Sequence, residues 1–212
     1  MELNQLHDIL LNAKKTGAAD IHFVVGSPPM MHLNDGFVPV PQAPITTVAI
    51  ADNLARALLT EAEIASLASQ KEIIRAYTFP DNLRCRFRIA FQKAVPSLSF
   101  HVLSEQLPTL QSLRLPDSIE RFIKLTRGLV LVAGPYGAGR SSTATAIVQE
   151  INRTRAVRIL TLEYPIEYIL ASAKSLVEQR EIGRDVPTYA EALNEVIDED
   201  VGVLYIDRLE GA

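Results

Sequence analysis

The pattern of hydrophobic and polar positions divides the chain into two parts that differ in their predicted order of helices and strands. In the first part, apolar residues recur at helical spacing over residues 4–16, and Gly17 ends that stripe. Two further helical patterns occupy residues 46–70, where Thr60 and Glu63 predict a capping pair at the start of the second helix. Strands are predicted at 20–25, 30–35, 37–40, 73–79, 84–91 and 97–103, with a turn at 34–36. This mixture is typical of a small α+β domain.

The second part alternates apolar strands with helices. Helices are predicted at 117–126, from about 140 to 153, and at 188–198, and strands at 128–134, 157–162, 175–182 and 201–207. The strand at 128–134, "GLVLVAG", is continuously apolar. Continuous apolar strands between helices indicate a mostly parallel sheet that is covered on both faces. The sequence therefore predicts the α/β class for the chain as a whole.

A segment that contains two prolines separates the two parts. Residues 104–117 read "SEQLPTLQSLRLPD" and show no sustained hydrophobic period. We therefore predict an N-terminal domain at 1–104, a linker at 105–117 and a second domain at 118–212.

Composition narrows the class of protein without indicating a function. Of the 212 residues, 48% are hydrophobic and 22% are charged, which is ordinary for folded domains and excludes a disordered chain. The formal net charge of −4 provides no basic field, so nucleic acid is not an expected partner. Cys85 is the only cysteine, which excludes an internal disulfide. The four histidines are scattered and form no metal site of familiar spacing.

Nothing in the hydrophobic pattern indicates secretion or a membrane span. The N-terminal residues "MELNQLHDILLNAKK" mix charges with leucines and lack the continuous apolar core of a signal peptide. No apolar run approaches the roughly 18 residues that a spanning helix needs. We therefore expect a cytoplasmic protein without direct membrane insertion.

Residues 134–142, "GPYGAGRSS", carry the most specific candidate chemistry. Gly-x-x-x-x-Gly followed by a cation and a serine, between an apolar strand and a helix, is the pattern of a loop that binds nucleotide phosphates. The helix N-terminus adds positive potential, and Ser141 is placed to bind Mg²⁺ through its hydroxyl. The predicted nucleotide-binding residues are Gly134, Gly137, Gly139, Arg140, Ser141 and Ser142.

The cation of this loop is Arg140, where the pattern has lysine. A lysine ammonium is compact and reaches the β- and γ-phosphates from inside the loop. The guanidinium keeps the positive charge, but it is planar, larger and prefers bidentate contacts from the side. Phosphate binding is therefore expected to tolerate the change better than phosphoryl transfer.

Four stretches together resemble one family. The strand, loop and helix start "GLVLVAGPYGAGRSSTA" are similar to the phosphate-loop region of the secretion ATPase superfamily, and most similar to the type IV pilus retraction ATPases (the PilT group). The opening motif of that group resembles "GAADIHFVVGSPPMMHLNDG" at 17–36, its acidic box resembles "ILTLEYPIEY" at 159–168, and the segment after it resembles "QREIGRD" at 179–185. The motifs occur in the right order and span nearly the whole chain.

The resemblance implies a fold, cofactors and an activity. It implies a PAS-like N-terminal domain, a RecA-like motor domain with a phosphate loop (P-loop), and a hexameric ring in which ATP hydrolysis between subunits drives pilus disassembly. ATP and Mg²⁺ are the implied cofactors. Glu163 matches a glutamate implicated in activating the attacking water. Arg86 and Arg88 match arginines that approach the nucleotide of a neighbouring subunit, although the stripe that they form with Arg84 is equally well explained as the solvated face of a strand.

This chain departs from the family at polar positions. Tyr164 replaces the aspartate of the acidic box, and a tyrosine hydroxyl lacks the negative charge of a carboxylate near Mg²⁺. Arg208 stands where the next acidic strand of the family has its essential glutamate. Asp207 precedes it, so a one-residue bulge would let Asp207 serve together with Ser141 on the Mg²⁺ side. Because the apolar scaffold around these positions is retained, the changes indicate a relaxed catalytic demand with a retained structural one.

The resemblance also implies more sheet than residues 1–212 provide. In the family, further strands and a helical region follow the strand that matches 201–207. A RecA-like sheet that stopped at this strand would have an uncovered apolar edge, which we expect to be paired with another subunit or a partner.

Three functions stay open on this evidence. The first is a degenerate family member that binds nucleotide weakly, hydrolyses little, and acts as a regulatory or structural partner of a type IV pilus or secretion motor. The second is a functional ATPase for pilus retraction (twitching motility) or secretion, with Glu163 or Asp207 near Mg²⁺. The third is an interaction module that binds no nucleotide. Expected partners are further copies of the chain, a motor ATPase or an inner-membrane platform protein, which would hold the chain peripherally at that membrane.

Overall fold

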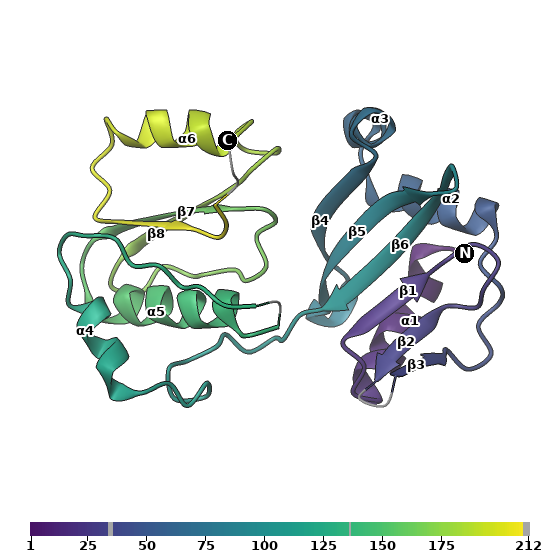
Figure 1. Cartoon of the computed structure of the whole chain (residues 1–212), viewed down its shortest axis with the longest axis horizontal. Helices are drawn as coiled ribbons and strands as arrows, with labels where there is room; N and C mark the ends of the chain where they lie inside the picture. Colours follow the sequence, from purple (N-terminus) through teal and green to yellow (C-terminus); the bar gives the residue numbers. More distant parts are fainter. Residues whose placement is uncertain (34–35, 136, 210–212) are drawn as a thin grey trace. The chain divides into compact units, whose positions relative to one another are not determined.

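The computed structural model describes residues 1–33, 36–135 and 137–209, and the chain divides into two units, Met1–Glu105 and Gln106–Ala212 (Figure 1). Each unit has hydrophobic core residues of its own. The turn predicted at 34–36 lies partly outside the described residues.

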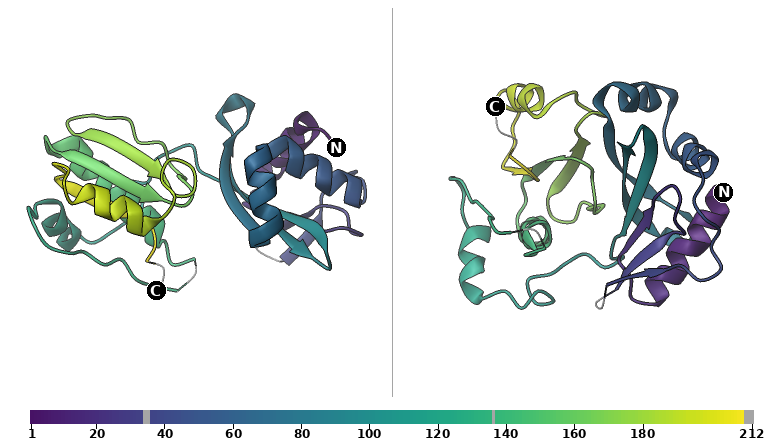
Figure 2. Two further views of the ribbon diagram at one scale, coloured as in Figure 1. Left: turned by 90° about the horizontal axis from the view of Figure 1, so that it is seen from above. Right: turned by 45° about the vertical axis from the view of Figure 1, so that its right-hand side comes forward.

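The N-terminal unit is a six-stranded antiparallel sheet with the strand order β3-β2-β1-β6-β5-β4. Its strands are β1 (Asp20–Phe23), β2 (Met30–Leu33), β3 (Gly36–Pro39), β4 (Glu72–Thr78), β5 (Arg84–Gln92) and β6 (Val95–Val102). Its helices are α1 (Leu3–Lys15), α2 (Val48–Leu58) and α3 (Glu61–Gln70), and a short 3-10 helix covers Pro80–Asn82. Helices α1 and α2 lie on one face of the sheet (Figure 2).

Alternation along the long strands explains this arrangement. In β5 and β6 every second side chain is buried, so that Phe87 lies opposite Phe100 and Ile89 opposite Leu98 in the core. The opposite face of β5 carries Arg88, whose guanidinium donates two hydrogen bonds of 2.8 Å to the carboxylate of Glu72. A period of two with one apolar face is typical of an antiparallel sheet that is packed on one side.

The second unit contains a three-stranded parallel sheet with the order β8-β7-β9. Its strands are β7 (Arg158–Glu163), β8 (Leu176–Glu181) and β9 (Val203–Ile206). Its helices are α4 (Glu120–Ile123), which follows a 3-10 turn at Asp117–Ile119, α5 (Arg140–Thr154) and α6 (Tyr189–Val196). Helices α5 and α6 lie on opposite faces of the sheet (Figures 1 and 2). The α/β class with a mostly parallel second sheet is therefore confirmed.

Strand β7 is buried on both faces because each face meets a helix. Ile159 packs with the side chains of α5, whereas Leu160 and Leu162 pack with Ala192 of α6. Thr161 and Glu163, which alternate with the leucines, therefore lie on the α5 side of the sheet. The alternation of β7 thus places two polar side chains next to the helix that follows the glycine-rich loop.

One predicted strand was wrong. Residues 129–134 have no regular secondary structure, and within the described part of the chain no backbone hydrogen bond joins them to another segment. The side chains of Leu129 and Leu131 are 82% and 66% exposed. An apolar segment becomes a strand only beside a hydrogen-bonded neighbour. The sheet of β8, β7 and β9 provides none for this segment, whereas most other predicted elements are present with boundaries shifted by a few residues.

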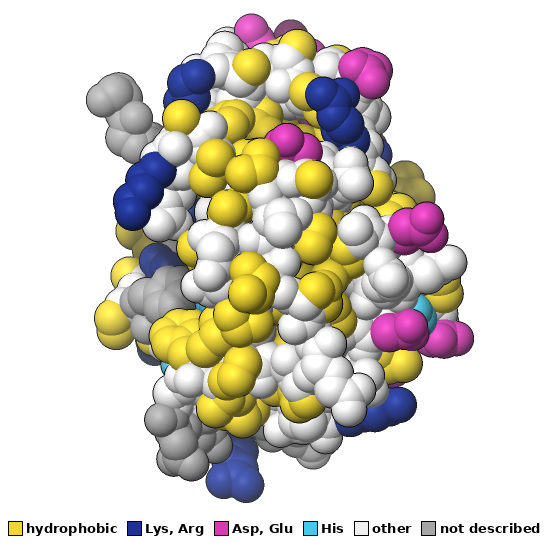
Figure 3. Space-filling view, turned by 90° about the vertical axis from the view of Figure 1, so that its right-hand side faces the viewer, with side chains coloured by type: hydrophobic (Ala, Val, Ile, Leu, Met, Phe, Trp, Pro, Cys, Tyr) yellow, Lys and Arg dark blue, Asp and Glu magenta, His cyan; other side chains and the backbone are white. Residues whose placement is uncertain are grey.

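The distribution of side chains on the surface adds little to the assignment of a function. Figure 3 shows one side of the molecule, on which hydrophobic side chains lie among uncharged ones and the Lys and Arg side chains are separated from one another. Among the described residues, no helix combines the length and the apolar character that crossing a membrane requires. The functional residues must therefore be sought in local geometry.

Candidate functional site

The glycine-rich loop leads directly into α5. Gly139 is the N-cap of this helix with a φ of 81°, a left-handed conformation that glycine adopts without steric cost. At Gly134 the backbone is approached closely, because a Cβ there would lie 3.2 Å from the Cβ of Ala138 and 3.8 Å from the Cγ of Arg140. The described part of the loop therefore folds back on the start of α5, which is the path that a phosphate-binding turn needs.

Arg140 and Ser141 form the exposed first turn of α5. Within the described residues, the guanidinium of Arg140 makes no hydrogen bond or ion pair. The N–H groups at the start of a helix have no partners inside that helix, and together with the helix dipole they favour an anion. A free cation, unpaired N–H groups and a serine hydroxyl therefore occur together at one helix end.

The next turns of α5 contact the ends of β7 and β9. The side chain of Ser142 is hydrogen-bonded to that of Tyr168, which follows β7, and Thr145 is hydrogen-bonded to Tyr205 of β9. The predicted loop residues thus belong to the same region as the acidic residues at the strand ends. Arg86 and Arg88 belong to β5 of the other unit.

Glu163 lies at the end of β7 with only 6% of its surface exposed. Its Oε1 atom accepts a hydrogen bond from the hydroxyl of Thr161 at 2.6 Å and another from Nε2 of Gln179 at 3.0 Å. Burial raises the pKa of Glu163 to about 7, the negative charges of Asp207 and Glu167 act in the same direction, and the two hydrogen bonds oppose them. This carboxyl group therefore exchanges its proton near neutral pH.

Sequence reasoning missed Gln179 as a site residue. Besides holding Glu163, its amide accepts a hydrogen bond from the N–H of Leu170 at 2.7 Å and donates one to the carbonyl oxygen of Tyr168 at 2.9 Å. Gln179 therefore connects the acidic strand end to the segment that contacts Ser142. Its signal in the sequence was its place at the start of "QREIGRD" at 179–185, which had been noted only for its resemblance to the family.

Asp207 follows β9, and both of its carboxylate oxygens accept hydrogen bonds from protein donors. Oδ2 accepts from the backbone N–H of Tyr164 at 2.9 Å, and Oδ1 accepts from the hydroxyl of Tyr189, the first residue of α6. Burial raises the pKa of Asp207, while the bonds from Tyr189 and Tyr164 lower it. Sequence reasoning singled out Asp207 but gave no indication of Tyr189.

Arg208 completes this group of side chains. Its guanidinium lies 5.1 Å from the ring centroid of Tyr164 and donates a hydrogen bond to the carbonyl oxygen of that residue. Its Nε atom is 3.7 Å from Oδ2 of Asp207. The two replacements noted in the sequence, Tyr164 and Arg208, are therefore in direct contact with each other.

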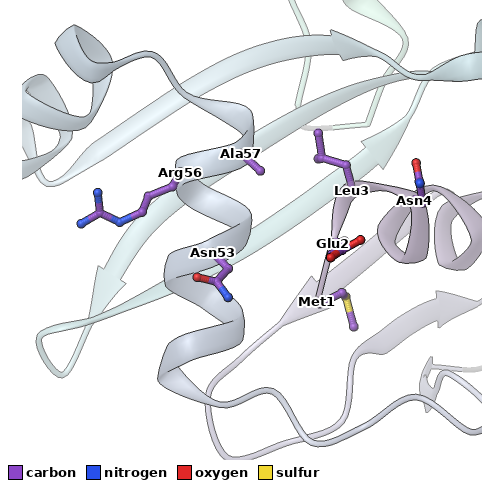
Figure 4. Close-up of a pocket in the computed structure, with 7 residues that line it drawn as sticks. All are labelled: Met1, Glu2, Leu3, Asn4, Asn53, Arg56 and Ala57. Atoms are coloured by element: carbon purple, nitrogen blue, oxygen red, sulfur yellow. The ribbon is translucent and has the colours of Figure 1, made fainter.

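A pocket also lies in the N-terminal unit, lined by residues 1–4 together with Asn53, Arg56 and Ala57 (Figure 4). The side chain of Arg56 points away from the N-terminal residues (Figure 4). None of the predicted nucleotide-binding residues lines it. We therefore take the loop and the strand ends, rather than this pocket, as the candidate site.

Comparison with known proteins identifies the family. Residues 67–200 match the family model described as Type II/IV secretion system protein. The chain belongs to this family. The type IV pilus retraction ATPase PilT of Pseudomonas aeruginosa is 30% identical over 202 residues, which cover 95% of this chain and 58% of that protein. The type IV pilus ATPase PilU of the same organism is 26% identical over 209 residues, covering 99% and 54%.

A solved structure agrees with these matches. The crystal structure of the pilus retraction motor PilT with bound ADP superimposes with a TM-score of 0.84 and 29% identity, covering 96% of this chain and 60% of that chain. The predicted resemblance to the PilT group is therefore confirmed, and with it membership of a family of type IV pilus and secretion ATPases. The chain spans about three-fifths of the length of these relatives.

Proposed function

We propose that this chain is a degenerate member of the family that binds adenine nucleotide weakly at the loop before α5 and hydrolyses it little. In this proposal it acts as a regulatory or structural partner of a type IV pilus or secretion motor. One contrast carries the proposal. Arg140 at the loop is exposed and free among the described residues, whereas Glu163 is buried, Asp207 is half-buried, and the carboxyl groups of both are hydrogen-bonded by the protein.

The contrast separates binding from hydrolysis. Phosphate binding needs donors and positive charge, which Gly139, Arg140 and Ser141 offer at the start of α5. Hydrolysis also needs carboxylates that hold a metal ion and orient water. Both oxygens of Asp207 already accept a hydrogen bond and Arg208 lies 3.7 Å from Oδ2, so this second requirement is poorly met. The PilT relative of known structure holds ADP, which makes ADP the first ligand to test.

Assembly belongs to the same proposal. A nucleotide at an exposed helix end would be covered by a second copy of the chain or by a related motor subunit. We place Arg86 and Arg88 toward the nucleotide of such a neighbour. Arg88 would have to leave its two hydrogen bonds with Glu72 to make this contact.

The test is calorimetric titration of ADP and ATP into the purified chain and into Arg140→Ala. Loss of one charge-assisted contact to phosphate costs about 1.5–3 kcal/mol, so we expect the affinity to fall by roughly tenfold or more. Arg56→Ala is the matched control, because it removes an exposed helical arginine from the other unit. Equal affinities of Arg140→Ala and the unchanged chain would contradict binding at this loop.

A functional ATPase is the second candidate, and the arrangement around Glu163 favours it. A carboxyl group held by Thr161 and Gln179 with a pKa of about 7 has the properties of a general base at neutral pH. Sustained phosphate release that Glu163→Gln abolishes would establish this candidate. Saturable binding without release would establish the first.

A further inference from the structure

A loop of this kind ordinarily binds its nucleotide together with Mg²⁺, which is held by the serine of the loop and by a carboxylate at the end of a neighbouring strand. In this chain the corresponding residues are Ser141, at the start of α5, and Asp207, after β9. Whether they fit Mg²⁺ depends on the free lone pairs of Asp207 and on the charge around it.

The carboxylate of Asp207 is committed to other contacts. Tyr189 and the backbone of Tyr164 each donate to a different oxygen, and 15% of the side chain is exposed. Each oxygen keeps a second lone pair, so Mg²⁺ could bind only next to these donors and next to the guanidinium of Arg208, whose Nε lies 3.7 Å from Oδ2.

The local positive charge is supplied by the protein as well. The guanidinium of Arg208 lies against Asp207 and Tyr164 and is anchored to the carbonyl oxygen of Tyr164. A divalent cation at the same carboxylate would be repelled by this arginine. Arg208 thus occupies the electrostatic role that a metal ion would have beside Asp207.

Glu163 does not compensate for Asp207. Glu163 is buried, and its Oε1 atom accepts hydrogen bonds from Thr161 and Gln179. Over the whole described part of the chain, no three side chains of His, Cys, Asp or Glu are arranged to hold a metal ion. A nucleotide-bound Mg²⁺ takes most of its ligands from phosphates and water, so its fit here depends on Asp207, and the adjacent guanidinium of Arg208 makes that fit unfavourable.

We propose that this chain binds nucleotide without a divalent cation coordinated by the protein. Tyr189, Tyr164 and Arg208 contact the carboxylate that would otherwise face the metal ion. We call these three residues together with Asp207 the Asp207 cluster. The ligand class is then a metal-free nucleoside diphosphate or triphosphate, whose negative charge is met by Arg140 and the N–H groups of α5. The inference rests on the proposed nucleotide binding and adds the form of nucleotide that is bound.

The first test compares the affinity for ADP in excess MgCl₂ with that in EDTA, at constant ionic strength. We expect the dissociation constant in MgCl₂ to equal or exceed that in EDTA, because Mg²⁺ withdraws free ADP into a less negative complex and adds no protein contact. Affinity that rises by roughly tenfold or more in MgCl₂ would overturn this inference and leave the proposed nucleotide binding intact. Absence of binding in both solutions would overturn the proposed function and the inference together.

The second test examines the Asp207 cluster by a double-mutant cycle. We expect Asp207→Asn and Tyr189→Phe each to lower the melting temperature, and the double variant to melt close to the lower of the two single variants, because one weakens and the other removes the same contact. Additive shifts would show that the two side chains act independently, which overturns the cluster.

The Asp207→Asn variant also has a readout that stability alone does not change. If Asp207 bound Mg²⁺, this variant would lose ADP affinity in MgCl₂ but not in EDTA. We expect the ratio of the two dissociation constants to stay the same as in the unchanged chain. Should Asp207→Asn fail to fold, Tyr189→Phe keeps the carboxylate and undergoes the same comparison. A higher affinity of the unchanged chain in MgCl₂ than in EDTA still decides against the inference.

Discussion

The carboxyl group of Glu163 lies where burial, two hydrogen bonds and two neighbouring acidic side chains act on it at once. Burial is the largest of these effects and raises its pKa from 4.5 to about 7. The folded chain therefore holds a proton that the unfolded chain releases between these two pH values. Its contribution to stability is fully present below about pH 4.5 and is lost as the pH rises toward 7.

We predict that Glu163→Gln removes this dependence on pH. A difference of about 2.5 pKa units corresponds to roughly 3 kcal/mol, so the free energy of unfolding of the variant should gain roughly 2–3 kcal/mol relative to the unchanged chain between about pH 5 and about pH 8. Urea unfolding at the two pH values measures this gain. Glu120→Gln, an exposed glutamate of α4, should leave the pH profile unchanged. Parallel profiles for Glu163→Gln and the unchanged chain would contradict the assignment.

For individual residues, the sequence identified the candidate site residues but not their hydrogen-bond partners. Glu163, Asp207 and Arg140 stand out because carboxyl groups and a cation occur in recognisable motifs. The side chains that determine their chemistry are distant in sequence. Gln179 is 16 residues from Glu163, and Tyr189 is 18 residues from Asp207. Such hydrogen bonds depend on how the strands are ordered, which no local pattern of residues contains.

Among the elements, those with local signals were predicted most accurately. The N-terminus of α3 is fixed by Thr60 and Glu63, which exchange hydrogen bonds of 3.3 and 2.9 Å between side chain and backbone, as the capping pair predicted. The segment 128–134 has the composition of a buried strand and is nevertheless exposed and irregular. A helix cap is completed within four residues, whereas a strand requires a neighbour from elsewhere in the chain.

We predict that Leu131→Lys changes the free energy of unfolding of the chain by less than about 0.5 kcal/mol, because an exposed side chain contributes little to the core. Leu160→Ala, at a fully buried residue of β7, is the matched control and should lower the free energy of unfolding by about 2–5 kcal/mol. Urea unfolding compares the two variants. Hydrogen exchange should also be fast for the amides of residues 129–133, which have no hydrogen-bonded partners in the described chain. A large loss of stability from Leu131→Lys, with slow exchange, would indicate that the segment is a paired strand.

At the scale of the whole molecule, the chain has two units with separate cores. Nucleotide binding should therefore depend on the stability of the unit that contains the loop. The core of the N-terminal unit is built by its own sheet and helices, with Phe87, Phe100 and Leu98 almost completely buried. The second unit packs β7 between α5 and α6 through separate clusters. The hydrophobic periodicity of the sequence predicted the change in architecture between the two parts. It did not predict that the loop segment would be left outside the second sheet.

Separate cores predict separate unfolding transitions. Phe87→Ala should lower the free energy of unfolding of the N-terminal unit by about 3–5 kcal/mol. It should leave the melting temperature of the second unit and the affinity for ADP unchanged. Leu160→Ala should instead lower the melting temperature of the second unit, which contains α5 and β7. It should weaken ADP binding at temperatures where that unit is partly unfolded. Calorimetric melting with and without ADP distinguishes these outcomes, because a ligand raises only the transition of the unit that binds it. If either substitution shifts one common transition, the two units fold as one cooperative body, and the affinity measured for ADP then belongs to the whole chain rather than to the unit that carries Arg140.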